Sequence, residues 1–102
     1  MKNYRLSYLP LFDEDLAEAW SYIAKKLHNP EAANKLVADV EDAILKRQKA
    51  PESFESYRSV KERKYPYYRI YVKNFSVFYV VIGDVMEVRR FLYQRRDLRE
   101  LL

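Results

Sequence analysis

The stretch YYRIYVKNFSVFYVVIGDVMEVRRFLY, residues 67–93, decides the fold. It is rich in tyrosine, phenylalanine, valine and isoleucine, which favour strands. Two short connections, Lys73-Asn74 and Gly83-Asp84, divide it, and Gly-Asp is a frequent hairpin turn. The stretch therefore predicts consecutive antiparallel strands over residues 67–72, 75–82 and 85–93.

Upstream of this stretch, the sequence predicts one short strand and two helices. Tyr4–Leu9 alternates weakly and is expected to form the strand, which Pro10 ends. A first helix is expected to be capped near Asp13, and a second is expected to begin at Pro30 after the N-cap Asn29. Apolar residues recur at helical spacing at Leu16, Trp20, Ile23 and Leu27, and again at Ala33, Leu36, Val37, Val40 and Ile44.

The expected elements define a fold class. Residues 50–65 lack a clear period and are expected to form a long loop, so the predicted order is β-α-α-β-β-β. The short break between the helices predicts a helical hairpin, which has to bury its apolar stripe against the sheet. The sequence thus predicts a single α+β domain over residues 1–102, with an antiparallel sheet packed on a helical hairpin.

Composition excludes several kinds of site. The 102 residues include no cysteine and one histidine, His28, which excludes disulfides, thiolate metal centres and paired-histidine chemistry. The sequence has no apolar run long enough to span a membrane, and its N-terminus lacks the apolar core of a signal peptide. We therefore expect a cytoplasmic protein that uses no metal or cofactor.

Charge is distributed unevenly along the chain. Residues 1–56 carry 8 Lys/Arg against 10 Asp/Glu, a net charge of −2. Residues 57–102 carry 11 Lys/Arg against 5 Asp/Glu, a net charge of +6. This asymmetry favours an anionic partner for the C-terminal half. The alternative is that the basic residues only keep an exposed sheet soluble.

Hairpin pairing predicts which side chains share a face of the sheet. If Val72 and Phe75 flank the first turn, Arg69 lies opposite Phe78, and the same step across the second turn puts Arg89 beside Phe78. One face is then expected to carry Tyr67, Arg69, Tyr71, Phe78, Arg89, Phe91 and Tyr93. Such a basic, aromatic face is able to hold phosphates and stack bases.

The arginines of this face have a second interpretation, and Arg90 does not fit the predicted register. The alternative is that Arg69 and Arg89 pair with Glu87 and nearby acids, as charges on an exposed sheet often do. In the same register Arg90 points toward the core, which either places it at the core margin or shows that the register fails at the end of the strand.

The chain resembles the RelE/ParE superfamily of toxins from type II toxin–antitoxin modules. The matching pieces are the N-terminal strand and the segments AEAWSYIAKKLHNPEAANKL, YYRIYVKNFSVFYVV and VRRFLYQRRDLRELL. The resemblance implies a small antiparallel sheet that cradles a helical hairpin, a functional face opposite the helices, and a cognate antitoxin as partner.

The resemblance also implies two activities. Members of the RelE branch are metal-independent endoribonucleases (mRNA interferases), which cleave messenger RNA in the ribosomal A site and so inhibit growth. Members of the ParE branch block DNA gyrase instead. Of the two, ribosome-dependent cleavage is the expected activity, with gyrase inhibition as its rival on the same fold. A degenerate binding module without toxicity is a third possibility, and plasmid stabilisation is the associated biological role.

Individual residues are assigned from the resemblance and from the predicted face. Arg69 matches a basic catalytic residue of the nuclease branch, and Arg96 matches the arginine of its last strand or tail. Ser76 departs from the branch, which typically has an arginine there, and Arg89 is the candidate to replace that arginine. Arginine suits stabilisation of the phosphorane, because its charge is permanent and its donors form a fixed fork.

The candidate catalytic residues are therefore Arg69, Arg89, Arg96 and Tyr93, where Tyr93 donates a proton or stacks on a base. Glu87 is a candidate base unless it is paired with Arg89. The candidate RNA-binding residues are Lys61, Lys64, Tyr67, Tyr71, Phe78, Arg95 and Arg99.

Overall fold

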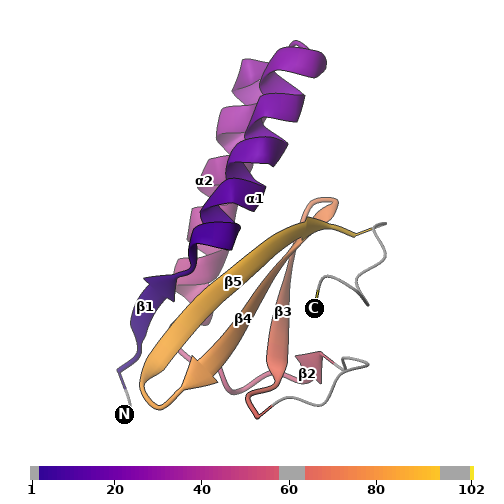
Figure 1. Ribbon diagram of the computed structural model, residues 1–102. Helices are drawn as coiled ribbons and strands as arrows, with labels where there is room; N and C mark the ends of the chain where they lie inside the picture. Colours follow the sequence, from indigo (N-terminus) through magenta and orange to yellow (C-terminus); the bar gives the residue numbers. More distant parts are fainter. Residues whose placement is uncertain (1–2, 58–63, 95–101) are drawn as a thin grey trace.

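A five-stranded sheet and a helical hairpin make up the residues that the computed structural model describes, which are 3–57, 64–94 and 102. The strands are Arg5–Tyr8 (β1), Ser56–Tyr57 (β2), Tyr67–Val72 (β3), Phe75–Ile82 (β4) and Val85–Tyr93 (β5). They lie in the order β1-β5-β4-β3-β2 (Figure 1). The predicted α+β class is confirmed, and the bounds of β3, β4 and β5 are those predicted.

Two details of the sheet differ from the prediction. β1 runs parallel to β5, so the sheet is mixed rather than wholly antiparallel. The segment predicted as a loop contains β2, which pairs Ser56 with Tyr68 and Tyr57 with Tyr67 at the edge of the sheet. A strand of two residues is too short to show a period of two, so the sequence pattern gave no sign of it.

The hairpin consists of α1 (Pro10–Ser21), a π-helical turn η1 (Tyr22–Lys26) and α2 (Pro30–Arg47). The expected cap near Asp13 is wrong, because α1 begins at Pro10 and its N-cap, Leu9, makes no side-chain cap bond. Proline already has helical φ and lacks an N–H, so it starts a helix without a polar cap. The second cap is confirmed, since Asn29 Oδ1 accepts a 3.1 Å hydrogen bond from the Ala32 amide.

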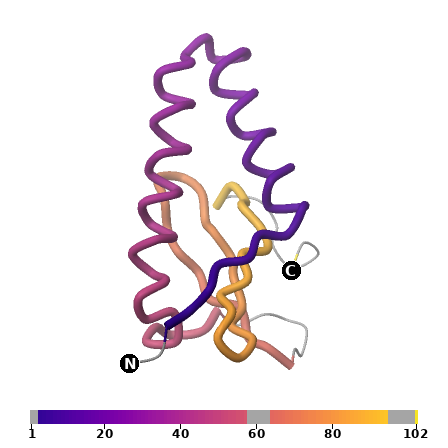
Figure 2. Tube along the Cα trace, turned by 90° about the vertical axis from the view of Figure 1, so that its left-hand side faces the viewer, coloured from indigo at the N-terminus to yellow at the C-terminus, as the bar shows by residue number. Residues whose placement is uncertain are grey.

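The main core lies between the hairpin and one face of the sheet. Figures 1 and 2 show the hairpin against the sheet, with its far end projecting beyond the strands. The core joins α1 and α2 to β3, β4 and β5 through Phe12, Leu36, Val40, Ile44, Ile70, Val77, Tyr79, Met86, Val88 and Phe91. No helix in the described ranges is both long and apolar enough to cross a membrane.

Leu27 leaves the stripe on which the sequence placed it. The Leu27 amide donates to the Tyr22 carbonyl at 3.0 Å, a wide turn of the π type, and the Leu27 side chain is 54% exposed. A π turn inserts one residue into a helix and rotates the residues after it about the helix axis. Leu27 therefore points out of the core, whereas Leu16 and Ile23 pack against it as predicted.

A second apolar cluster covers the other face of the sheet. Its buried members are Tyr67, Phe78, Val80, Leu92 and Leu102, and Tyr57, Tyr65 and Ile82 pack around them. Phe78 is wholly buried and Tyr67 is 5% exposed. The face opposite the helices is thus largely a second core, not the open aromatic platform that the sequence predicted.

A β-bulge in β5 changes which side chains share that face. Tyr79 pairs with Val88, but Phe78 pairs with Arg90, so Arg89 is the extra residue. From there on, every β5 side chain is shifted to the opposite face. The expected placement of Phe91 and Tyr93 beside Arg69 is therefore wrong. Their rings lie on the helix side, 4.7 and 5.5 Å from the ring of Phe75.

The β4–β5 turn allows a test of backbone strain. Gly83 has φ +62°, and a Cβ built on it meets no atom within 4 Å. We expect Gly83→Ala to lower the free energy of unfolding by about 1 kcal/mol, through left-handed backbone strain alone. The control is the reverse change, Lys73→Gly, at a residue of the β3–β4 turn with φ 57°. It should not lower the free energy of unfolding, because glycine adopts this φ without strain. Urea unfolding measures both; a neutral Gly83→Ala would show that φ is not what selects glycine here.

Candidate functional site

Arg69 on β3 is held in a fixed orientation on the face opposite the helices. Its Nε donates a 2.8 Å hydrogen bond to Ser76 Oγ on β4, and Ser76 is wholly buried. The guanidinium carbon lies 4.5 Å from the ring centre of Tyr71, and 5.4 Å from those of Tyr57 and Phe78. Three aromatic rings and a buried hydroxyl thus position this side chain before any ligand binds.

Arg69 forms no ion pair with any carboxylate in residues 3–57, 64–94 or 102. The only hydrogen bond of its side chain with those residues uses Nε, so neither terminal nitrogen is bonded to them. The sequence left two interpretations of Arg69, binding of an external anion and pairing with Glu87. The structure excludes the pairing with Glu87. An oriented guanidinium with free terminal donors is suited to a bidentate contact with a carboxylate or phosphate.

Arg89 is occupied by an internal partner. Its Nε donates to Glu87 Oε2 at 2.8 Å, and the two side chains are 25% and 19% exposed. Burial lowers the pKa of Arg89, but the hydrogen bonds with Glu87 and Tyr67 outweigh it and raise the pKa overall. The pairing interpretation therefore holds for Arg89. Glu87, the candidate base, is held in the same ion pair and does not meet the condition of being unpaired.

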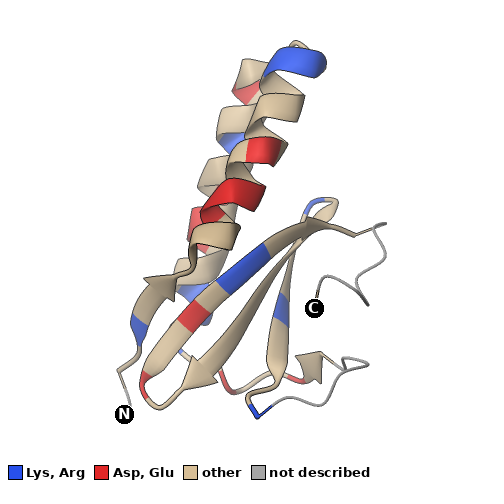
Figure 3. Ribbon diagram, in the orientation of Figure 1, with Lys and Arg blue, Asp and Glu red and all other residues tan. Residues whose placement is uncertain are grey.

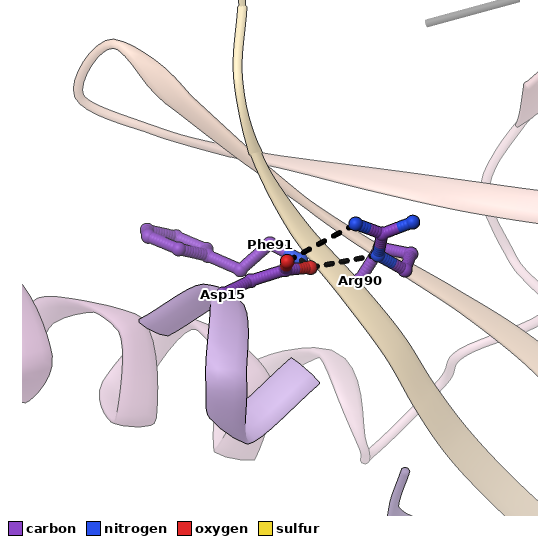
Figure 4. A network of polar contacts seen from close by, with 3 residues as sticks. All are labelled: Asp15, Arg90 and Phe91. Carbon is purple, nitrogen blue, oxygen red and sulfur yellow. Dashed lines mark hydrogen bonds and ion pairs between the residues drawn. The ribbon is translucent and has the colours of Figure 1, made fainter. Parts of the chain in front are cut away.

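Arg90 ties the sheet to α1 through Asp15, as Figure 4 shows. Arg90 Nε and Nη2 donate to the two Asp15 oxygens at 2.7 and 3.0 Å, and the Phe91 amide donates to Asp15 Oδ2 at 3.0 Å. The hydrogen bond with Asp15 raises the pKa of Arg90, against the lowering effect of burial. Arg90 and Asp15 are 15% and 10% exposed, so this is a largely desolvated pair that serves the fold.

Arg47, at the end of α2, supports the strand that carries Arg69. Its Nη1 donates to the Arg69 carbonyl at 3.3 Å and to Tyr79 Oη at 2.9 Å, and its guanidinium lies 3.5 Å from the ring centre of Phe54. Tyr79 in turn donates to the Pro51 carbonyl. Nothing in the spacing of the sequence indicated this contact of Arg47.

Among the other predicted residues that the structure describes, Tyr71 and Phe78 lie against the Arg69 guanidinium. Tyr71 is beside it and 66% exposed, and Lys64 is exposed with its ammonium 5.5 Å from the ring centre of Tyr65. Phe78 and Tyr67 are too deeply buried to stack on a base. Tyr93 lies on the other side of the sheet. Lys61, Arg95, Arg96 and Arg99 lie outside the described residues.

Ser76 has a role that sequence reasoning missed, although the predicted register contained the signal. With Arg69 opposite Phe78 and Tyr71 opposite Ser76, Arg69 and Ser76 are diagonal neighbours on one face. Where the nuclease branch is expected to have an arginine, this chain has a hydroxyl that orients Arg69.

Charge is unevenly distributed over the elements. Figure 3 shows acidic residues along α1 and basic residues on β3 and β5, and β5 also carries the acidic partner of Arg89, Glu87. The net charge of +6 for residues 57–102 already counts Glu87, the partner of Arg89, and Arg90 and Lys73 pair with Asp15 and Asp39 of the acidic half, so less positive charge is free than +6 suggests. Among the described residues, the cation best placed for an external anion is Arg69.

These features define a class of small α+β protein with a helical hairpin on one face of the sheet and an oriented arginine on the other. Residues 6–98 match the family described as the ParE toxin of type II toxin-antitoxin system, parDE. The chain belongs to this family of toxins.

Solved structures share the fold. A chain from the chromosomal ParDE TA system of P. aeruginosa is similar with a TM-score of 0.73 and 18% identity, over 89% of this chain and 96% of that one. A chain of the archaeal RelE-RelB complex from Pyrococcus horikoshii OT3 is similar with a TM-score of 0.54 and 18% identity, over 93% and 99%. No curated protein matches the chain by sequence.

Proposed function

We propose that this toxin inhibits DNA gyrase by binding it, without catalysing a reaction, and that a cognate antitoxin neutralises it. The observation that carries the proposal is the surroundings of Arg69. They hold one oriented cation and an exposed tyrosine, and no carboxylate of the described residues forms an ion pair with that cation.

Cleavage of RNA needs more than one cation. The 2′-hydroxyl has to lose a proton, the phosphorane has to be stabilised, and the leaving oxygen has to gain a proton. Among the described candidates, Glu87 is tied to Arg89, and Tyr93 lies on the opposite side of the sheet from Arg69. These placements count against proton transfer at Arg69.

Binding needs only what the site offers. Arginine and tyrosine are the residues most often found at the energetic centre of protein interfaces. Arg69 and Tyr71 stand side by side over a packed base of Phe78 and Tyr57, so little side-chain freedom is lost when a partner contacts them. The terminal nitrogens of Arg69 suit a carboxylate on a protein surface. Gyrase and ribosomes are cytoplasmic, so the proposal places the toxin in the cytoplasm.

Ribosome-dependent cleavage of messenger RNA is the second candidate, and Arg69 itself favours it. Its free donors fit a phosphate as well as a carboxylate. In this candidate Arg96 and the basic tail supply the remaining contacts to RNA.

The proposal predicts a growth phenotype together with a biochemical one. Expression of the toxin alone should arrest growth, and coexpression of its antitoxin should restore it. Purified toxin should inhibit gyrase supercoiling at stoichiometric concentration, since each bound toxin disables one enzyme and none turns over. Normal growth with soluble, folded toxin present would remove the proposal, and so would arrest with fully active gyrase.

A further inference from the structure

The main chain of β3 at Arg69 is held from the end of α2. Val72 and Phe75 flank a two-residue turn and so exchange hydrogen bonds, and alternation along the ladder then turns the Arg69 carbonyl away from β4. In the described ranges β2 pairs with β3 no further than Tyr68. The Arg69 carbonyl instead accepts a 3.3 Å hydrogen bond from Arg47 Nη1. For this carbonyl, Arg47 takes the place of a neighbouring strand.

Arg47 is itself fixed on a rigid base. The same nitrogen donates to Tyr79 Oη at 2.9 Å, and the guanidinium lies 3.5 Å from the ring centre of Phe54. Tyr79 is wholly buried and donates to the Pro51 carbonyl at 2.8 Å. Burial raises the pKa of Tyr79, against the lowering effect of the bond with Arg47, so the hydroxyl keeps the proton that it donates. Ile44, one turn earlier on α2, is 1% exposed, so the helix that carries Arg47 is anchored in the core.

Two contacts therefore determine where the Arg69 guanidinium lies, since Ser76 holds its Nε from β4 and Arg47 holds its carbonyl from α2. The Nε bond limits rotation of the side chain, whereas the carbonyl bond limits movement of the strand. The edge of a sheet has no ladder on its outer side, so a side-chain donor that bonds an edge carbonyl restricts the strand there. A binding residue loses affinity when the element that carries it is free to shift.

We propose that Arg47 is a positioning residue of the Arg69 site, which acts on inhibition by fixing the edge of β3 and makes no contact with the target. The inference rests on the proposed function in taking gyrase as the target for the inhibition assay. It extends the site past the edge of the sheet to the end of α2. A change on the helix side of the molecule is thus expected to weaken a contact made on the opposite face.

Substitutions of Arg47 are available that keep much of its packing. Arg47→Met removes the donors and keeps most of the side-chain stem, and Arg47→Lys restores a donor on a stem of similar length. Lys46→Met is the matched control, because it removes the neighbouring charge of the same helix end at an exposed residue. Urea unfolding gives the folded fraction of each variant, so that equal concentrations of folded protein are compared.

A measurement on the free toxin tests the positioning itself. The Arg69 Nε–H is bonded to a buried hydroxyl, so its NMR signal is expected to exchange slowly with water, and Arg69→Ala identifies the signal by removing it. Arg47→Met should raise this exchange rate at least about tenfold, while Arg47→Lys and Lys46→Met should stay within about threefold of wild type. An unchanged rate in Arg47→Met would overturn the proposal, whatever the target of the toxin.

A double-mutant cycle separates positioning from a direct contact and from a loss of stability. Arg69→Ala keeps the carbonyl that Arg47 bonds, so Arg47→Met removes the same folding contacts with and without the Arg69 side chain. In the wild-type background Arg47→Met should raise the inhibitory concentration for gyrase about tenfold, and in the Arg69→Ala background by no more than about twofold. An equal factor in both backgrounds would overturn the proposal, because Arg47 would then act independently of Arg69.

The outcomes for Arg47 are distinct from those for the proposed function. If wild-type toxin leaves gyrase active, the proposed function is overturned. The exchange rate of the Arg69 Nε–H, with the same cycle scored by growth arrest, then still decides the role of Arg47. If wild type inhibits gyrase and folded Arg47→Met inhibits it equally well, the positioning role alone is overturned.

Discussion

Replacing Asp15 with alanine is expected to lower the free energy of unfolding by about 3–5 kcal/mol, which is the usual cost of breaking a buried ion pair. The change leaves Arg90 partly buried without its carboxylate, and it removes the acceptor of the Phe91 amide. Single domains have about 5–15 kcal/mol of stability in all, so a large share would be lost. Urea unfolding, monitored by the fluorescence of Trp20, measures the effect.

The matched control is a pair at the surface. Arg5 and Asp84 are 3.2 Å apart but 74% and 52% exposed, so Arg5→Ala should cost no more than about 1 kcal/mol. A double change, Asp15→Ala with Arg90→Met, should recover part of the loss, because it also removes the partly buried charge that has lost Asp15. If Asp15→Ala cost no more than Arg5→Ala, the network in Figure 4 would not secure α1 to the sheet.

Replacing Arg69 with alanine is expected to weaken inhibition of the target by about 2–4 kcal/mol, the usual cost at the centre of an interface. That range corresponds to roughly 30-fold to 1000-fold in the inhibitory concentration. Arg69 makes no ion pair with the described residues. We therefore expect the variant to fold and to lose inhibition because its contact with the target is missing. Titration of gyrase supercoiling measures the effect, and a urea melt checks that the variant is folded.

Ser76→Ala separates orientation from charge. It keeps the cation and removes the 2.8 Å hydrogen bond that fixes the cation, so inhibition should fall by a smaller factor, about tenfold. Arg69→Lys should resemble alanine more than arginine, since lysine lacks the planar fork. Wild-type inhibition by Arg69→Ala would show that the target contacts another surface.

The sheet was largely predictable from local pattern. The bounds of β3, β4 and β5 followed from alternation and from two turns, and so did the pairing of Arg69 with Phe78. The bulge at Arg89 was not predictable, since its stabilising contact is Asp15, 76 residues away from Phe91. Without that contact, neither the position of Tyr93 nor that of Phe91 can be derived from the sequence.

The candidate site was predictable only in part. Arg69 was identified from strand parity and from resemblance, and the structure gives it an oriented side chain whose terminal nitrogens bond to none of the described residues. The burial of Phe78 and Tyr67 depends on Leu102, which returns to the sheet from the far end of the chain. The exposed position of Leu27 follows from the π turn, and no helical periodicity predicts a π turn.

The most direct test of the central claim is to induce the toxin in cells and to map DNA breaks linked to gyrase and new RNA 5′ ends in the same samples. The proposed function predicts gyrase-linked breaks or loss of supercoiling within the time of growth arrest, without new cleavage inside messages, and neither effect with Arg69→Ala. Cleavage of translated messages at codon boundaries, with gyrase unaffected, would contradict it and would establish the endoribonuclease instead.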